Sequence, residues 1–374
     1  MRTFSIAALA ALLAAPGVLG AQQNLYPQAS IVGGVEARQY SFGSNFVVDQ
    51  LRQISVPLGA IVPVGKRFSF DIGSSYAVTT VKDSAGSRSF SGLTDTQIRG
   101  SYVFGNDVLV ASLMVNLPTG KATTTLSKFG ISSAASSNFL LFPVNSYGAG
   151  FSVTPGLAAA TTAGSWNLGL AGSVRLSAKY NPFSDNTGVS YKPGLETRLR
   201  AGADRLLGSS RLALGFTFST FSNDQLRGGG FGGSGVYDPG NRFLVDASLL
   251  AAAGTGTVSF YAWDYYRTAS ATSGSVSNNE NVLTLGTAGS FPLGPKLAIE
   301  PLAEARIWSP KVGSGLLVGG GASLRIDVNP RVAIVPGARL DFGTIKGPDQ
   351  GANPVIRSHS ITSWDLSALL RYGF

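Results

Sequence analysis

The sequence contains no cysteine and a single histidine, and charged residues make up only 13% of its 374 positions. The lack of cysteine excludes disulfide bonds, thiolate nucleophiles and thiolate metal ligands. The one imidazole, that of His359, excludes a multi-histidine metal site, and we expect no cofactor. The net charge of +9 comes from lysines and arginines that form no runs, so we expect no nucleic-acid partner.

Long hydrophobic runs are also missing. The longest uncharged stretch, Phe129–Val174, is interrupted by Pro143, Pro155 and many glycine and serine residues. It never offers the roughly 20 consecutive apolar residues that a transmembrane helix requires. A helical membrane protein is therefore excluded.

The N-terminus has the composition of a secretory signal peptide. Met1–Arg2 is positively charged, Phe4–Ala15 is apolar, and small residues end the segment at Gly20 and Ala21. The apolar stretch is too short for a membrane anchor, and no basic cluster follows it. We expect residues 1–21 to be a signal peptide and residues 22–374 to be the exported domain.

What the sequence does contain is glycine, 48 residues, and a 44% share of apolar residues arranged with a period of two. Between Phe68 and Val78, apolar side chains occupy nearly every second position and Ser, Asp, Gly and Ala fill the others. Successive strand side chains point to opposite faces, so each such segment has one apolar and one polar face. The pattern recurs in Thr96–Phe104, Leu109–Leu117, Phe151–Ala159, Trp166–Tyr180, Leu195–Ala203, Leu212–Thr220, Phe243–Ala251, Leu283–Phe291, Leu297–Ile307, Leu316–Val328, Val332–Phe342 and Trp364–Phe374.

The length of these segments separates a soluble sandwich from a membrane barrel. They exceed the roughly 5–6 residues of an ordinary strand and match the ~9–11 residues that cross a bilayer at a tilt. Aromatic residues stand at segment ends, as in Trp166, Tyr180, Trp364 and Tyr372, and resemble the two aromatic girdles of such barrels. The charges on the polar faces suit a wet lumen better than a packed core.

Short connections alternate with mostly longer ones, as periplasmic turns alternate with extracellular loops in outer-membrane barrels. The short set is Pro63–Lys66, Gly105–Asp107, Ala163–Ser165, Asp204–Ser210, Gly254–Gly256, Pro292–Lys296 and Asn329–Arg331. We predict an all-β fold, a transmembrane antiparallel up-and-down β-barrel of 16 strands. This count needs weakly patterned strands near Ser30–Tyr40 and at Leu51–Val62. Without them the alternative is 14 strands with an N-terminal plug.

Prolines and aromatics disturb the pattern in two ways. Pro155, Pro301 and Pro336 fall inside expected strands and lack the N–H that a ladder uses, so we expect bulges there. The triplet Tyr261, Trp263 and Tyr265 is placed on the outer face, because the opposite choice would put Asp264 there.

The charged residues of the strands fall on the polar face, which a barrel turns inward. We expect the lumen to be lined by Asp71, Asp95, Arg99, Arg175, Lys179, Arg198, Arg200, Glu300, Glu304, Arg306, Arg325, Asp327, Arg339 and Asp341, with Glu196, Arg211, Asp246, Asp264, Asp365 and Arg371. Acidic and basic groups nearly balance, which argues against strong ion selectivity overall. Arg325 with Asp327 and Arg339 with Asp341 are expected to pair and brace the wall.

The longest loop, Pro118–Tyr147, carries Lys121 and Lys128 and no acid. A surface position is favoured, and an inward fold that narrows the pore is the alternative.

Catalysis has little support. Outer-membrane lipases resemble one another in a His-x-Ser pair, which brings a hydroxyl and an imidazole together on one strand face. Here the residue two positions after His359 is Ile361, so that pair is missing. The glycine-rich segment Gly228–Gly235 lacks the Lys-Ser/Thr that follows a phosphate loop. We therefore expect no enzymatic activity.

Two segments resemble known families. The ending Leu370-Arg371-Tyr372-Gly373-Phe374 resembles the assembly signal of Gram-negative outer-membrane barrels, with Phe374 as the terminal aromatic. Ser91–Phe104 and Val115–Lys121 resemble the outer-membrane transporters annotated with phenol-degradation (meta-pathway) operons.

These resemblances imply an integral outer-membrane location, recognition by the barrel-assembly machinery, and contact with membrane lipid and lipopolysaccharide. They imply a channel or porin for passive uptake of small solutes, including aromatic or apolar ones, and leave a homo-oligomer open. The alternative is a structural or adhesive barrel without transport.

Overall fold

The computed structural model of the chain describes residues 29–104, 108–228, 235–272, 275–276, 278–350 and 355–373. The expected signal peptide, residues 1–21, and the terminal Phe374 lie outside these residues. Within them, the helical segments are too short or too polar to cross a bilayer.

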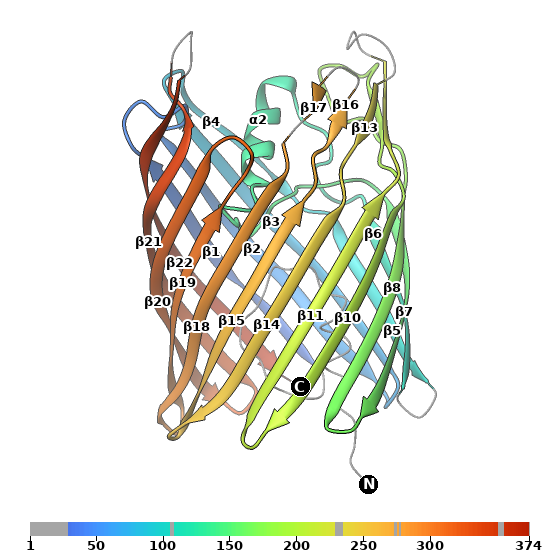
Figure 1. Cartoon of the computed structure of the whole chain (residues 1–374), viewed down its shortest axis with the longest axis vertical. Helices are drawn as coiled ribbons and strands as arrows, with labels where there is room; N and C mark the ends of the chain where they lie inside the picture. The colour runs from blue at the N-terminus through green and yellow to red at the C-terminus, as the bar shows by residue number, and fades with distance from the viewer. Residues whose placement is uncertain are drawn as a thin grey trace.

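A closed antiparallel barrel of 16 strands accounts for most of the chain (Figure 1). The wall strands are β1 (Ser30–Phe42), β2 (Gln50–Val64), β3 (Phe68–Asp83), β5 (Thr96–Phe104), β6 (Leu109–Leu117), β7 (Ser152–Ala163), β8 (Trp166–Ser177), β10 (Glu196–Leu207), β11 (Ser210–Phe221), β14 (Arg242–Ala253), β15 (Gly256–Arg267), β18 (Glu280–Gly294), β19 (Leu297–Trp308), β20 (Ser314–Asn329), β21 (Val332–Pro348) and β22 (Ile356–Gly373). Each pairs with its neighbour in the sequence, and β1 closes the ring on β22. The 16-strand prediction is confirmed, and the 14-strand alternative is wrong because β1 and β2 are wall strands.

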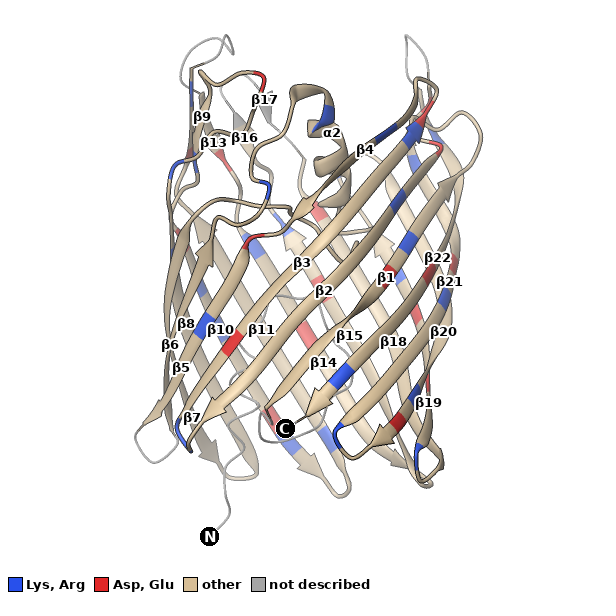
Figure 2. Ribbon diagram, turned by 180° about the vertical axis from the view of Figure 1, so that it is seen from behind, with Lys and Arg blue, Asp and Glu red and all other residues tan. Residues whose placement is uncertain are grey.

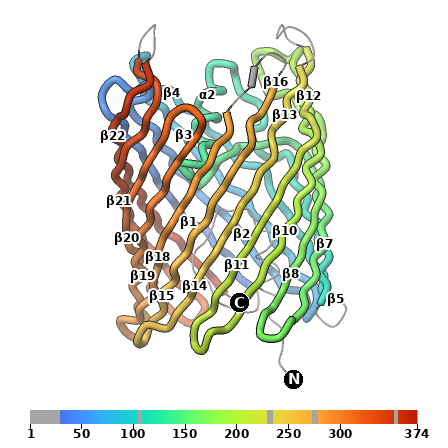
Figure 3. Tube along the Cα trace, viewed as in Figure 1, coloured from blue at the N-terminus to red at the C-terminus, as the bar shows by residue number. Residues whose placement is uncertain are grey.

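The two ends of the barrel differ as expected. Tight turns join the strands at one end, where Gly164 and Gly254 adopt the positive φ that such turns require. At the other end lie the helix α2 (Leu126–Ala135), the strand β4 (Gly86–Leu93) beside β3, and a small loop sheet. The loop sheet comprises β9 (Ser190–Lys192), β12 (Asp224–Arg227), β13 (Gly235–Asp238), β16 (Ala271–Thr272) and β17 (Ser275–Val276). The tube trace shows these elements gathered above one rim (Figure 3).

The outer face of the wall is an apolar belt. Leu170, Leu199 and Val245 are 62%, 52% and 52% exposed, as are many other outward leucines, valines and isoleucines. A soluble protein rarely leaves so continuous an apolar surface in water. Figure 2 shows charged residues only sparsely distributed along the strands. This belt places the barrel in a membrane.

Aromatic side chains edge the belt at both ends. Near the long loops, the ring of Phe243 lies 5.1 Å from that of Phe218 and 6.2 Å from that of Tyr266. Near the tight turns, the rings of Phe68 and Phe70 are 4.5 Å apart. Such girdles mark the two membrane interfaces of outer-membrane barrels, and in those barrels the longer loops face the extracellular side.

The expected outward position of Tyr261, Trp263 and Tyr265 is wrong. Trp263 pairs with Asp246 and Tyr261 with Gly286, and the hydroxyl of Tyr261 donates to Glu304 inside the barrel. Gly286 makes this possible, because a Cβ there would collide with the Tyr261 ring. Asp264 consequently faces outward.

The expected bulges at Pro155, Pro301 and Pro336 are also wrong. Strand partners on either side of each proline keep one constant register. At Pro155, β7 does not pair with β8 but keeps its pairing with β6, so the missing N–H interrupts one ladder without shifting its register. Bulges occur instead near Gly294 and Asn329, next to tight turns.

Asp264 provides a test of the inside–outside assignment. Its carboxylate accepts a hydrogen bond from Asn281 (2.7 Å) on the membrane-facing side of β15 and β18. We expect Asp264→Leu to raise the free energy of unfolding by roughly 1–2 kcal/mol, because a charged group on the lipid face is destabilising. Denaturant titration of the barrel in lipid bilayers measures this change.

Asp246→Leu on the adjacent strand is the matched control. Asp246 faces the lumen and pairs with Arg200 (2.9 Å), so its loss leaves a cation unpaired. This variant should lower the free energy of unfolding by roughly 1–3 kcal/mol. If both substitutions change stability in the same direction, the assignment of the two faces is incorrect.

Candidate functional site

The most distinctive feature of the lumen is the segment 118–151 between β6 and β7, here called the inward loop. Figures 1 and 2 show its helix α2 within the open end of the barrel. Asp95, 7% exposed, holds both ends of this loop: it accepts hydrogen bonds from the N–H of Gly120 (3.0 Å) and of Ala149 (2.7 Å). Asn116 donates to the same carboxylate (2.8 Å). Asp95 was expected to line the pore, but both of its carboxylate oxygens accept hydrogen bonds from residues at the two ends of the loop.

The middle of the inward loop reaches the opposite wall. Arg306 on β19 donates to the carbonyl of Phe139 (2.5 Å), and Asn138 donates to Glu280 on β18 (3.0 Å). The ring of Phe139 also stacks on that of Trp308, 5.7 Å away. In the ring order, β19 lies across the barrel from β6 and β7, so the loop spans the lumen.

A second set of contacts attaches the following part of the inward loop, residues 140–144, to β1 and β2. Gln53 exchanges two hydrogen bonds of 2.8 Å with the backbone N–H and carbonyl of Val144. Tyr40 donates to the carbonyl of Leu140, and Arg38 to that of Leu141. The backbone polar groups of the loop are thus satisfied by side chains from the wall, as burial requires.

An apolar cluster fills the space between the inward loop and one arc of the wall. The loop contributes Ile131, Phe139, Leu140, Phe142, Val144 and Tyr147, and the wall and its loops contribute Tyr40, Phe46, Leu51, Ala77, Val81, Phe90, Leu317, Ile345 and Ile361. The favoured surface position of the loop is therefore wrong. The sequence held a signal for the inward fold, because the run Phe139-Leu140-Leu141-Phe142-Pro143-Val144 is too apolar for an exposed loop.

A carboxylate and arginine network braces the wall beside this cluster. Glu304 accepts from Arg306 (2.6 Å), Arg339 (2.9 Å) and Tyr261 (3.0 Å). Arg339 also bonds Asp341 (2.7 Å), so this expected pair forms. These short, charge-assisted bonds link β15, β19 and β21 behind the inward loop.

The other expected lumen charges also lie mostly in pairs. Arg99 bonds Asp71 between β5 and β3, and Arg325 lies 3.8 Å from Glu300 and 3.5 Å from Asp327. Arg200 pairs with Asp246. Lys179 lies beyond the end of β8, beside the loop sheet. The structure therefore brings most of the expected set together as wall braces, with Lys179 away from them.

One cluster of charged side chains, on β8 and β10, has more basic than acidic members. Glu196, whose side chain is 9% exposed, lies 2.6 Å from Arg198 and 3.9 Å from Arg175. Both arginine side chains are 36% exposed, more than those of the braced arginines around Glu304. This group carries a net positive charge on the lumen wall, away from the apolar cluster.

His359 occupies a structural position. It is 8% exposed, packs against the ring of Phe46 at 5.1 Å, and has its Nε2 2.9 Å from Asp349. Ile361, its neighbour on the same face, is fully buried. Across the described ranges no group of three or more potential metal ligands occurs.

Comparisons with known proteins reach only the level of architecture. No family model and no curated protein matches this sequence. A Pseudomonas aeruginosa FadL homologue has a TM-score of 0.49 at 9% identity, covering 94% of this chain and 91% of that one. OmpT, an outer membrane protein of Vibrio cholerae, has a TM-score of 0.43 at 9% identity and covers 92% and 97%. An anion-selective porin from Comamonas acidovorans has a TM-score of 0.41 at 12% identity and covers 92% and 98%. TM-scores this low assign no function, so function is inferred from the geometry of the chain itself.

Tyr147 offers a pH test of how the inward loop is held. Burial raises the pKa of its hydroxyl above the ordinary value near 10, and the hydrogen bond with Thr79 (2.6 Å) opposes this only partly. Because the fold favours the neutral phenol, its contribution to loop docking is complete below the ordinary pKa and is lost as pH rises through the raised one. We expect the loop to loosen above pH ~10.

The chain has no cysteine, so Ser133→Cys on the exposed side of α2 gives a single spin-label site. Its electron paramagnetic resonance spectrum should show rising mobility with pH, and Tyr147→Phe should remove or delay that rise. Tyr237→Phe in the loop sheet should leave the profile unchanged. An identical profile in Tyr147→Phe would contradict the role of this hydroxyl.

Proposed function

We propose that this protein is an outer-membrane channel for passive diffusion of small solutes, and that the inward loop narrows its lumen. The observation that carries the proposal is the attachment of Phe139 to Arg306 and Trp308 across the barrel. A barrel of this size is too wide for wall side chains to fill, so a loop that crosses it sets the free cross-section. Residues 1–21 as the signal peptide and Phe374 as the assembly signal for the barrel-assembly machinery belong to the same proposal.

The route for solute is proposed along β8, β10, β11 and β14. The apolar cluster occupies the arc of β1 to β3 and β20 to β22, which leaves the opposite arc for water. The exposed guanidinium groups of Arg175 and Arg198 lie on that opposite arc. Asp71, Arg99, Glu300, Arg325 and Asp327 would line the wall on the remaining strands.

Two features bear on the class of solute. The net positive group around Glu196 favours anions modestly, since the other wall charges are largely paired. Trp263 and Tyr265 face inward on β15, and their rings offer stacking surfaces for aromatic or apolar solutes. Together they favour small organic anions.

Single-channel conductance in planar bilayers tests the role of the loop. Phe139→Ala removes the contact with Trp308, and we expect a conductance at least about twofold higher with frequent switching between levels. Phe129→Ala is the matched control, because Phe129 is 52% exposed on the same loop and lies against Phe183 in a neighbouring loop. The loop does not narrow the pore if both variants conduct like the original protein.

Selectivity is tested by reversal potentials in a salt gradient. Arg175→Gln combined with Arg198→Gln leaves Glu196 as the only charge of the group, so the anion preference should fall and give way to a weak cation preference. Arg99→Gln combined with Arg200→Gln, which removes the same total charge from two 1:1 pairs, should have a smaller effect. Equal shifts in both variants would show that total charge, not this group, sets selectivity.

The second candidate is a structural or adhesive barrel without transport. The buried cluster favours it, because a loop held by so many contacts can seal the lumen. Absence of conductance in both the original protein and Phe139→Ala, with intact barrels, would support this reading over the channel.

A further inference from the structure

A cluster of unpaired cations lies at the extracellular rim outside the lumen. β9 and β12 pair so that Lys192 faces Gln225 and Ser190 faces Arg227. Strand alternation puts these four side chains on one face of the loop sheet. Together with Lys179 they line a cavity of about 160 Å³.

The position of Lys179 brings two like charges together. Tyr180 and Tyr191 form an antiparallel bridge, so Lys179 and Lys192, the next residues toward the barrel along each segment, lie opposite one another. Like charges directly opposite across a strand pair are destabilising. An anion bound between them would remove this repulsion.

No protein carboxylate supplies that anion among the described residues. None of their ion pairs involves Lys179, Lys192 or Arg227, and the one polar partner of the Arg227 guanidinium is Gln225 (3.2 Å). The acid nearest to Arg227 in the sequence, Asp224, is 6% exposed and belongs to the other face of β12.

Asp224 is also fully engaged. The hydroxyl of Tyr191 and the N–H of Gly194 (2.6 Å) both donate to its carboxylate. Burial, and then the bond to Asp224, raise the pKa of Tyr191, so this hydroxyl remains a donor at physiological pH. Asp224 therefore does not neutralise the cations. Asp238 on β13 lies on the cationic face by strand alternation, but it forms no ion pair with them.

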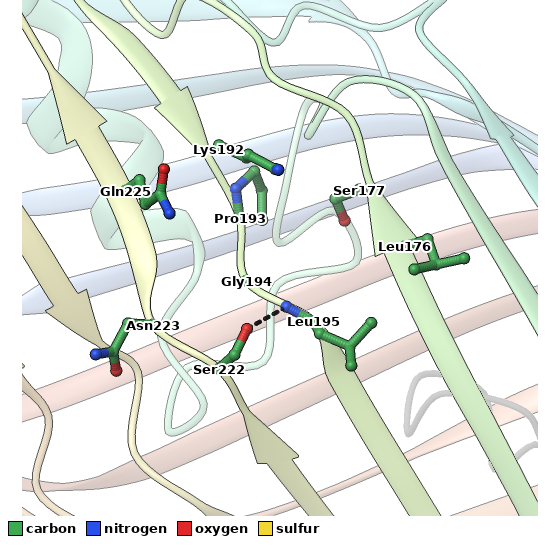
Figure 4. Close-up of a pocket in the computed structure, with 9 residues that line it drawn as sticks. All are labelled: Leu176, Ser177, Lys192, Pro193, Gly194, Leu195, Ser222, Asn223 and Gln225. Carbon is green, nitrogen blue, oxygen red and sulfur yellow. Dashed lines mark hydrogen bonds between the residues drawn. The ribbon is translucent and has the colours of Figure 1, made fainter.

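A neighbouring cavity adds an apolar surface to the site. A space of about 270 Å³ shares Lys192 and Gln225 with the first cavity and continues to Pro193, Leu176 and Leu195 (Figure 4). Leu176 and Leu195 are 55% and 41% exposed. Leu176 follows Arg175, which points into the lumen, so it points toward the membrane.

The site is therefore amphipathic at the height where the membrane ends. Cations lie at the loop sheet above the end of β8, and membrane-facing leucines lie directly below them. A soluble anion would use only the upper part. A lipid with a phosphorylated headgroup would use both, its phosphate on the cations and a hydrocarbon chain on the leucines.

We propose that Lys179, Lys192 and Arg227, with Leu176, Pro193 and Leu195, bind a phosphorylated glycolipid of the outer leaflet, a lipid A type molecule, through a phosphate and one acyl chain. The site lies outside the lumen and is independent of whether the channel conducts. It requires only that the barrel is inserted with this rim in the outer leaflet.

Binding of purified diphosphorylated lipid A to the refolded barrel in neutral detergent tests the proposal. Lys179→Gln, Lys192→Gln and Arg227→Gln combined should weaken binding by roughly tenfold or more, since charge-assisted contacts to phosphate are lost. The matched control combines Lys82→Gln, Lys311→Gln and Lys346→Gln, which remove the same charge from exposed positions elsewhere on this end of the barrel. The control should change the affinity less than about twofold.

Two further arms separate the sources of phosphate. Leu176→Asn with Leu195→Asn should weaken binding of lipid A while leaving the cations intact, and inorganic phosphate should not compete at concentrations comparable to those of the lipid. Circular dichroism, and the shift in electrophoretic mobility between boiled and unboiled samples, verify that each variant is a folded barrel.

The results overturn the proposal in three ways: equal losses in the site and control variants, no loss in the site variant, or competition by inorganic phosphate as effective as that by lipid A. The last result would indicate an anion site that uses no lipid chain. Conductance of the site variant should equal that of the original protein, which keeps this test distinct from that of the channel.

Discussion

Closure of the sheet is the constraint on which the rest of this structure depends. Within the hydrocarbon of a membrane, each unpaired backbone N–H or C=O costs several kcal/mol, so a sheet there cannot keep an edge. Pairing of β1 with β22 runs from Ser30–Gly373 to Phe42–Ile361 and removes the last edge. Once the ring is closed, strand alternation decides for every residue whether it meets lipid or lumen.

Closure creates a second problem, an interior too wide for side chains to fill. This chain meets it by two means. Paired charges such as Arg99 with Asp71 link neighbouring strands across the wet wall, and the inward loop covers one arc with apolar side chains. The two are joined at Arg306, which bonds both Glu304 on the wall and the carbonyl of Phe139 on the loop. Wall and loop therefore share one hydrogen-bonded network.

The wall could be predicted from the sequence because its rule is local. Period-two alternation depends only on neighbouring residues, so strand positions, the strand count and the inward direction of Arg99, Arg306 and Asp341 followed from it. The rule failed at Tyr261, where both faces carry bulky side chains and a glycine on the next strand, Gly286, decides between them. The inward loop could not be placed by period at all. Its position depends on partners such as Gln53, Arg306 and Trp308, which are distant in the sequence and carry no pattern that marks them as partners.

Charged side chains are arranged differently in the lumen and at the rim, and strand alternation explains both arrangements. Inside, arginines lie beside carboxylates, because a cation facing a narrow lumen without a partner would repel its neighbours and bias every solute that passes. At the rim, Lys179, Lys192 and Arg227 lie together without such partners, although Asp224 is on the same short strand as Arg227. Alternation turns that acid to the opposite face, where Tyr191 and Gly194 occupy it. The same period that keeps most strand charges out of the lipid belt thus separates cations from acid at its upper edge, where the proposed lipid phosphate would bind.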